Sequence, residues 1–212
     1  MPTLLFIRHG ENDFVKKGLL AGHTPGIHLN EKGRAQAQDL AESLKDVPIA
    51  AIYSSPLERA VETAAPLAKN RGLRIQVRRG LIETDIGAWQ GRELKKLRKL
   101  PEWRVVQGAP SRFRFPDGES FAGQQVRVVA ELEAICKAHK PEEIVACVFH
   151  ADPIKLAIAF YLGMPLDNFQ RIGVETGSVS VLHISDHSAV LVKQNLKPPF
   201  KFSIPEKKRK KK

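Results

Sequence analysis

Two short apolar runs that each end at a histidine constrain the fold of this chain more than any other feature. Residues 4–7 lead into Arg8 and His9, and residues 144–149 lead into His150, where a helical pattern begins at once. Apolar runs of about four to eight residues bounded by turns are typical of strands buried inside a sheet. We therefore expect both histidines and the arginine at points where the backbone leaves one sheet.

Strand and helix patterns alternate along the chain without an internal repeat. Asn30 is a suitable N-cap for the first long helix, and Pro56 suits the first turn of the second. The expected strands cover residues 4–8, 49–53, 73–77 and 144–149, the expected helices 31–44, 56–69, 121–138 and 153–162, and a closing hairpin 179–184 and 189–195. This alternation predicts an α/β fold, a three-layer sandwich whose mostly parallel central sheet carries helices on both faces.

The histidines and Arg8 indicate a site for a phosphate ester. Ligands of such sheets bind beyond the carboxyl ends of the strands, where these residues and the segment that begins at Ser54 are expected to lie. An isolated histidine is more often a surface or core-edge residue, so the interpretation depends on the combination. Attack on a phosphate ester needs fixed cations around an unprotonated imidazole nitrogen. Arg8 supplies a planar guanidinium fork that matches phosphate oxygens, so the set predicts a site that holds a phosphate and attacks it.

Five segments occur in an order that resembles a known family. They are Arg8-His9-Gly10, SSPLERAVETA at residues 54–64, ETDIGAWQG at 83–91, PDGES at 116–120, and His150. In this order they resemble the histidine phosphatase superfamily, and within it the phosphoglycerate-mutase-like branch. The resemblance covers nearly the whole chain and leaves out only residues 92–115 and the tail after residue 196. Arg-His-Gly alone is a weak pattern, whereas five ordered segments are a strong one.

The resemblance implies a role for each matching residue. His9 is then the nucleophile that forms a covalent phosphohistidine, and Arg8, Arg59 and His150 form the phosphate pocket. Arg59 would add a second planar guanidinium fork. Glu83 stands where the family keeps the carboxyl group that protonates the leaving alkoxide and later takes a proton from water. The competing carboxylates are Glu11, Asp85 and Glu119, of which the last better fits a helix start.

Two positions depart from the family pattern. Many relatives carry an asparagine where this chain has Val15, so a phosphate contact is missing or is taken over by Asn12 or another donor. Ala151 replaces the usual glycine after the second histidine. Its methyl group would crowd the phosphate, although its N–H still lies at a helix start.

The length of the chain favours a phosphatase of small phosphorylated metabolites over a cofactor-dependent phosphoglycerate mutase. The mutases of the family tend to be longer, with a tryptophan-rich segment where this chain has GLLAGHTPG at residues 18–26. The short insertion near residues 92–118 is expected to be a lid on a domain that spans residues 1–200. His23, Arg112 and Arg114 are the candidates for selecting the substrate, and the alternative is that the charges of the insertion form an ordinary solvated face.

The net charge of +11 comes largely from the end of the chain. Residues 207–212 are all basic, so the remainder carries only +5. Residues 201–212 are expected to form a disordered tail, and weak contact with RNA or an anionic surface is the alternative. A non-catalytic RNA- or protein-binding module is the hypothesis from another class, but it would be expected to have lost one or more of the five proposed site residues.

The remaining sequence features predict a cytoplasmic protein. No run reaches the roughly 18 apolar residues of a membrane span, and the first residues lack the features of a signal peptide. Cys136 and Cys147 fit buried apolar positions better than a disulfide, and no Cys/His cluster has zinc spacing. We expect no metal, no cofactor and no membrane partner, only a small phosphorylated metabolite, while monomer and dimer both stay open.

Overall fold

One mixed sheet forms the centre of the computed structural model, which describes residues 1–185 and 187–200. Its strands are β1 (Thr3–Arg8), β2 (Ile49–Ser54), β3 (Ile75–Val77), β4 (Ile144–Phe149), β5 (Val179–Ile184) and β6 (Ala189–Leu196). They lie in the order β3-β2-β4-β1-β5-β6, in which β1 to β4 are parallel and β5 and β6 are antiparallel to their neighbours. The predicted mostly parallel sheet is confirmed. The tail predicted at residues 201–212 lies outside the described residues.

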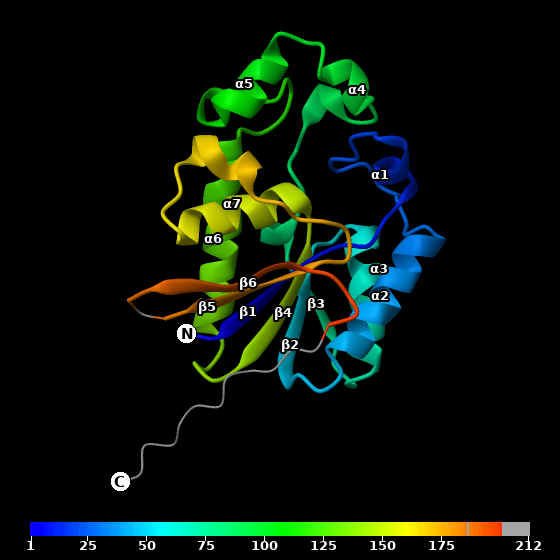
Figure 1. Ribbon diagram of the computed structural model, residues 1–212, viewed down its shortest axis with the longest axis vertical. Helices are drawn as coiled ribbons and strands as arrows, with labels where there is room; N and C mark the ends of the chain where they lie inside the picture. Colours follow the sequence, from blue (N-terminus) through cyan, green and yellow to red (C-terminus); the bar gives the residue numbers. More distant parts are fainter. Residues whose placement is uncertain (186, 201–212) are drawn as a thin grey trace.

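Helices cover both faces of this sheet (Figure 1). They are α1 (Asp13–Lys17), α2 (Glu31–Ser43), α3 (Glu58–Lys69), α4 (Leu94–Leu97), α5 (Glu102–Gly108), α6 (Phe121–Lys137) and α7 (Ala151–Tyr161). Short 3-10 turns occur at η1 (Arg79–Leu81), η2 (Gly87–Trp89), η3 (Pro110–Arg112) and η4 (Leu166–Arg171). Figure 1 shows α2 and α3 on one face and α6 and α7 on the other, which is the predicted three-layer sandwich. Of the helices that the structure describes, none is long and apolar enough to cross a bilayer.

Side chains of β1 alternate between two apolar cores. Leu4 and Phe6 pack in the core beneath α6 and α7, whereas Leu5 and Ile7 pack in the core beneath α2 and α3. Successive side chains of a strand point to opposite faces, and all four of these are at most 1% exposed. Burial on both faces explains why the run is apolar without interruption.

All predicted elements agree with the observed ones to within two residues. α3 begins at Glu58 rather than at Pro56, because the N–H of Ser55 still donates to a carbonyl of β4 at 2.9 Å. α7 begins at Ala151 rather than at Pro153, whose ring is tolerated because the first turn of a helix needs no N–H donor there. Only His150 therefore separates the end of β4 from the start of α7.

An aromatic cluster holds the insertion of residues 92–118 against the body of the protein. The cluster comprises Trp89, Trp103, Phe113, Phe115 and Phe121, with neighbouring ring centroids between 4.9 and 6.3 Å apart. Its helices α4 and α5 form one end of the molecule (Figure 1). Leu19 pairs with Glu93 in a short bridge, so the insertion also supports the loop that follows α1.

The two cysteines are buried and unpaired. Cys136 lies in α6 and Cys147 in β4, on the same side of the sheet. Burial raises the pKa of Cys136 to about 12 and raises the pKa of Cys147 as well, so both act as small apolar residues, as the sequence predicts.

Candidate active site

His9 and His150 come together because β1 and β4 are parallel neighbours. In the register of this pair Arg8 lies opposite Phe149, and the N–H of His9 donates to the carbonyl of Phe149 at 3.0 Å. The two imidazole rings lie edge to face with their centroids 5.1 Å apart, and they are 3% and 0% exposed. The topology of the sheet therefore builds the centre of the site from distant parts of the chain.

Hydrogen bonding determines the tautomer of His9. Its Nδ1 lies 2.7 Å from the carbonyl oxygen of Gly10, and because a carbonyl can only accept, Nδ1 carries the proton. Gly10 is held in turn by Thr63 of α3, whose hydroxyl accepts its N–H at 2.9 Å. Burial lowers the pKa of His9 well below its usual value, and the positive charges of Arg59 and Arg8 lower it further. Nε2 of His9 therefore keeps its lone pair at neutral pH.

Arg8 and Arg59 bring buried N–H groups without partners to this place. Nη1 of Arg8 donates to the carbonyl of Val174 at 2.7 Å, and Nη2 of Arg59 donates to the carbonyl of Gly22 at 2.9 Å. Among the described residues, Nε of both arginines and Nη1 of Arg59 have no hydrogen-bond partner. Buried charged donors are unfavourable unless they are paired. An anion between the two guanidinium groups would satisfy these three atoms.

His150 lies between a hydroxyl and a carboxyl group. Its Nε2 is 2.7 Å from Oγ of Ser55, and its Nδ1 is 3.9 Å from Oε2 of Glu83. Ser55 is buried, and in the described part of the chain Nε2 of His150 is the acceptor within reach of its hydroxyl proton, so the hydroxyl donates to Nε2. Burial lowers the pKa of His150 well below its usual value. The ring is therefore neutral, with its proton on Nδ1, the nitrogen nearer to Glu83.

The surroundings of Glu83 raise the pKa of its carboxyl group to near neutral pH. The side chain is 18% exposed, and burial together with the negative charge of Asp152 raises its pKa from 4.5 to about 7. The N–H of Thr84, which donates to Oε1 at 2.9 Å, and the positive charges of Arg59 and Arg8 act in the opposite direction but are outweighed. A carboxyl group with such a pKa can give and take a proton at neutral pH.

Other polar side chains hold the backbone around Glu83. Nε2 of His23 lies 2.6 Å from the carbonyl oxygen of Glu83, and a guanidinium nitrogen of Arg127 donates to the same oxygen at 3.3 Å. Arg127 also pairs with Glu119 at 2.6 Å, and Glu119 accepts the N–H of Asp85 at 2.9 Å. Glu119 precedes the N-cap of α6, so its contacts are structural and agree with the expected helix start.

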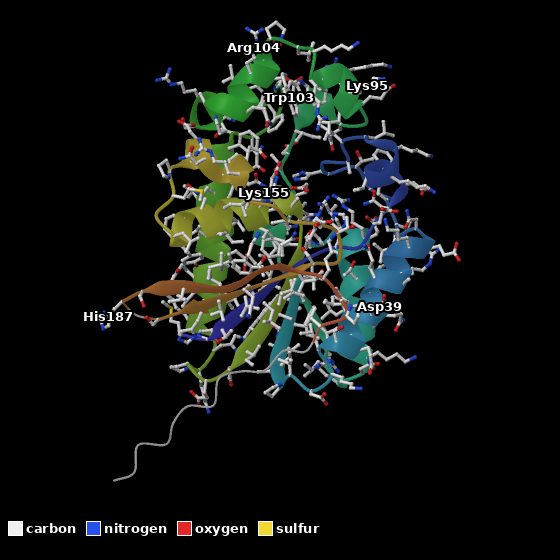
Figure 2. The ribbon with its side chains drawn as sticks, in the orientation of Figure 1. Asp39, Lys95, Trp103, Arg104, Lys155 and His187 are labelled. Atoms are coloured by element: carbon white, nitrogen blue, oxygen red, sulfur yellow. The ribbon has the colours of Figure 1, made fainter. Side chains whose placement is uncertain are left out.

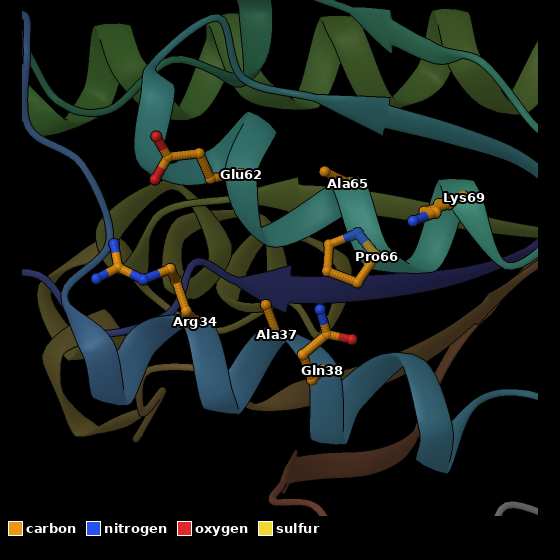
Figure 3. Close-up of a pocket in the computed structure, with 7 residues that line it drawn as sticks. All are labelled: Arg34, Ala37, Gln38, Glu62, Ala65, Pro66 and Lys69. Carbon is orange, nitrogen blue, oxygen red and sulfur yellow. The ribbon is translucent and has the colours of Figure 1, made fainter.

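A cavity of about 200 Å³ lies at this end of the sheet. Its wall consists of Arg8 at the end of β1, His9 and Asn12 after it, Val15 of α1, residues 19–22 of the following loop, Arg59 of α3, Glu83, Thr84 and Ile86, and Ala151 and Asp152 of α7. His150 lies beside two residues of this wall, His9 and Glu83. A larger hollow of about 520 Å³ between α2 and α3 contains none of the predicted site residues (Figure 3).

Asn12 serves both the backbone and the cavity. Its Oδ1 accepts the N–H of Val15 at 2.9 Å and so caps α1. Its Nδ2 is buried, has no partner among the described residues, and belongs to a side chain in the cavity wall. The amide therefore offers a donor at a place where Val15, which also lines the cavity, offers only methyl groups.

The three side chains predicted to select the substrate lie outside the cavity wall. His23 contacts the backbone of Glu83, as described above, and Arg114 donates to the carbonyl of Gly118 at 3.0 Å. Phe113 and Phe115 are buried, so the alternating Arg112 and Arg114 are exposed to solvent. Val15 of α1 and residues 19–22 of the next loop line the cavity, and no sequence pattern marks apolar residues there as part of a site.

Comparisons with known proteins agree with this geometry. A family model described as the histidine phosphatase superfamily (branch 1) matches residues 4–197. Phosphoserine phosphatase 1 of Hydrogenobacter thermophilus is 32% identical over 198 residues, which cover 92% of this chain and 93% of that protein. The 2,3-bisphosphoglycerate-dependent phosphoglycerate mutase of Thermoplasma acidophilum is 28% identical over 185 residues, 87% of this chain and 88% of that protein. A structure of phosphoserine phosphatase from Entamoeba histolytica in complex with 3-phosphoglyceric acid aligns with a TM-score of 0.84 at 28% identity, over 93% and 98% of the two chains.

Proposed function

The chain belongs to the histidine phosphatase superfamily, branch 1, and is a phosphatase of small phosphorylated metabolites; we propose that it acts through a covalent phosphohistidine on His9. The observation that carries this proposal is the tautomer of His9, which lines the cavity and has its free lone pair on Nε2. Arg8 and Arg59 bring unpaired N–H groups to the same cavity. A nucleophile and an anion site thus share one small space.

In the first step, Nε2 of His9 attacks phosphorus, so that an N–P bond forms and the P–O ester bond breaks. The electron pair of the broken bond goes to the leaving alkoxide, which takes the proton of the Glu83 carboxyl group. A pKa of about 7 keeps much of Glu83 protonated at neutral pH. Arg8 and Arg59 hold the non-bridging oxygens and balance their negative charge.

In the second step, a water molecule attacks the phosphohistidine. The carboxylate of Glu83 takes a proton from this water while the O–P bond forms. The N–P bond breaks, its electron pair returns to Nε2 of His9, and inorganic phosphate leaves. Glu83 serves both steps because the first step leaves it in the deprotonated form that the second step needs.

His150 and Asn12 complete the proposed phosphate site. Ser55 leaves the proton of His150 on Nδ1, which can donate to an oxygen of the transferring phosphoryl group. Nδ2 of Asn12 is a second unpaired donor. We assign to it the phosphate contact that Val15 cannot make.

Two expectations from the sequence remain proposals: the reaction needs no metal ion, and the protein works in the cytoplasm. Support for the first comes from the two arginines of the cavity wall, which supply the positive charge that a metal ion would otherwise bring to the phosphate. Within residues 1–185 and 187–200, no group of three or more His, Cys, Asp or Glu side chains could hold a metal ion.

Hydrolysis of p-nitrophenyl phosphate by three proteins tests the proposal. We expect His9→Ala to lose activity by about 10³-fold or more, since a missing nucleophile removes the covalent route. His187→Ala is the matched control, because His187 is exposed at the far end of the β5–β6 hairpin (Figure 2). EDTA should leave the wild-type rate unchanged. Full activity in His9→Ala would refute the intermediate, and EDTA inhibition that Mg²⁺ or Zn²⁺ reverses would refute metal independence.

A further inference from the structure

Asp152 is a carboxylate in the cavity wall that the proposed reaction does not use. It lies in the first turn of α7, two residues after His150, and its side chain is 31% exposed. Oδ1 of Asp152 lies 3.3 Å from Nζ of Lys155, which is shared with Oε1 of Gln170 at 3.2 Å. In the described part of the chain, no hydrogen bond reaches Oδ2 of Asp152. One oxygen of the carboxylate is therefore left for a ligand.

The charges around the cavity show which part of a substrate Asp152 would meet. The wall carries two cations, Arg8 and Arg59, and two carboxyl groups, Glu83 and Asp152. A bound phosphate dianion balances the two guanidinium groups, and Glu83 faces the leaving oxygen as a proton donor. Asp152 follows His150 by two residues, and Nδ1 of His150 lies 3.9 Å from Glu83, so Asp152 shares the cavity wall with the proton donor of the leaving group. The negative charge of Asp152 acts on both Glu83 and Arg8, so it lies near the phosphate site and the leaving oxygen.

The rest of the wall offers little to a second anion. Leu19, Leu20 and Ile86 are apolar, and within the described wall Arg8 and Arg59 are the only cations. Both are engaged by the phosphate in the proposed reaction. The volume of about 200 Å³ is below the roughly 300–1,000 Å³ of sites for drug-sized ligands, which fits a leaving group of few atoms.

We propose that Asp152 selects phosphate monoesters of small alcohols that carry an ammonium group near the ester oxygen. The ammonium group pairs with Oδ2 of Asp152 while Lys155 stays on Oδ1, whereas a carboxylate at the same place is repelled by Asp152. This inference rests on the proposed function, because it names the substrate class of the same site. A role of Asp152 confined to the start of α7, where its charge favours the helix dipole, would give no such preference.

Three two-carbon phosphate esters that differ only in the charge of the leaving group test the inference. O-Phosphoethanolamine carries an ammonium group at the same distance from the ester oxygen as phosphoserine, 2-hydroxyethyl phosphate is neutral there, and phosphoglycolate carries a carboxylate. We expect kcat/KM of the wild type to fall in that order, by about five- to tenfold at each step, as for a partly exposed ion pair. Asp152→Asn should bring the three values close together, and Asp152→Lys should reverse their order.

Two controls separate this inference from its alternatives. Asp39→Asn, on α2 and away from the cavity, should keep the wild-type order (Figure 2). If Asp152→Asn changes all three kcat/KM values by one factor, or if the wild type does not distinguish the esters, Asp152 does not select the substrate. Measuring His9→Ala with the same esters keeps the two proposals apart, because undiminished turnover by that variant would refute the phosphohistidine and not the selectivity.

Discussion

Replacing Glu83 by glutamine should change how the stability of the protein depends on pH. The native pKa of about 7 is raised above the ordinary value of 4.5, chiefly by burial. Between these two values the folded chain binds a proton that the unfolded chain has released. The stability that this proton contributes is complete below about pH 4.5 and is lost as the pH rises through about 7.

The size of this loss follows from the two pKa values. At about 1.4 kcal/mol per pKa unit, the rise from 4.5 to about 7 corresponds to about 3 kcal/mol of unfolding free energy. Most of this loss, about 2 to 3 kcal/mol, falls between pH 5 and pH 8. Glutamine has a similar shape and stays neutral, so Glu83→Gln does not suffer the loss. The free energy of unfolding of Glu83→Gln should therefore rise relative to that of the wild type by about 2 to 3 kcal/mol over that interval.

Urea denaturation at pH 5 and pH 8 measures this difference. Wild type, Glu83→Gln and Glu142→Gln are compared, the last because Glu142 is an exposed glutamate on the surface. The free energy of unfolding of Glu142→Gln should match that of the wild type at both pH values. The other titrating groups are common to all three proteins, so their contributions cancel in the comparison. If Glu83→Gln changes the free energy of unfolding equally at pH 5 and pH 8, Glu83 ionises as freely in the folded as in the unfolded chain.

Further predictions concern the guanidinium fork, the Ser55 hydroxyl and the Glu83 proton. Arg59→Lys should raise KM for p-nitrophenyl phosphate by about tenfold or more, because an ammonium group lacks the paired donors of a guanidinium group. Arg92→Lys, at an exposed position, should leave KM unchanged, and an unchanged KM in Arg59→Lys would contradict the prediction. Ser55→Ala should lower kcat about tenfold with little change in KM, since the hydroxyl of Ser55 keeps the proton of His150 on Nδ1. Ser55→Thr should restore part of the lost kcat, and a wild-type kcat in Ser55→Ala would exclude this role of the hydroxyl. For an alkyl phosphate, kcat/KM should fall above about pH 7 as Glu83 loses its proton, and a flat profile would assign the proton to another group.

The strand ends of the site could be predicted because a strand that is buried on both faces has an uninterrupted apolar sequence. Residues 4–7 of β1 and residues 144–149 of β4 are uninterrupted apolar runs, and they stop where Arg8 and His150 begin the site. Arg59 and Glu83 have no such mark, since an arginine on a helix and a glutamate in a loop look like solvated residues. Only the order of the motifs singled them out.

The wall of the cavity could not be predicted in the same way. Leu19 and Leu20 lie in a loop, where apolar residues follow no period that would reveal their direction. The insertion did contain a usable signal, because Phe113 and Phe115 alternate with arginines and the buried aromatic rings turn those arginines to solvent. Asp152 looks like an ordinary acidic residue in the first turn of a helix, and only the structure places it in the wall.

Trapping the phosphoryl group on His9 tests the central claim most directly. Nitrophenolate leaves with little need of a proton, so Glu83→Gln should still be phosphorylated by p-nitrophenyl phosphate but should hydrolyse the intermediate slowly. Intact-mass measurements on quenched samples should show one phosphoryl group that is labile in acid and stable in base, accompanied by a burst of nitrophenol. Peptide mapping should place it on His9, and Glu83→Gln with His187→Ala should carry it as well. A label that persists when His9→Ala is added to Glu83→Gln, or turnover by Glu83→Gln without any label, would contradict the account.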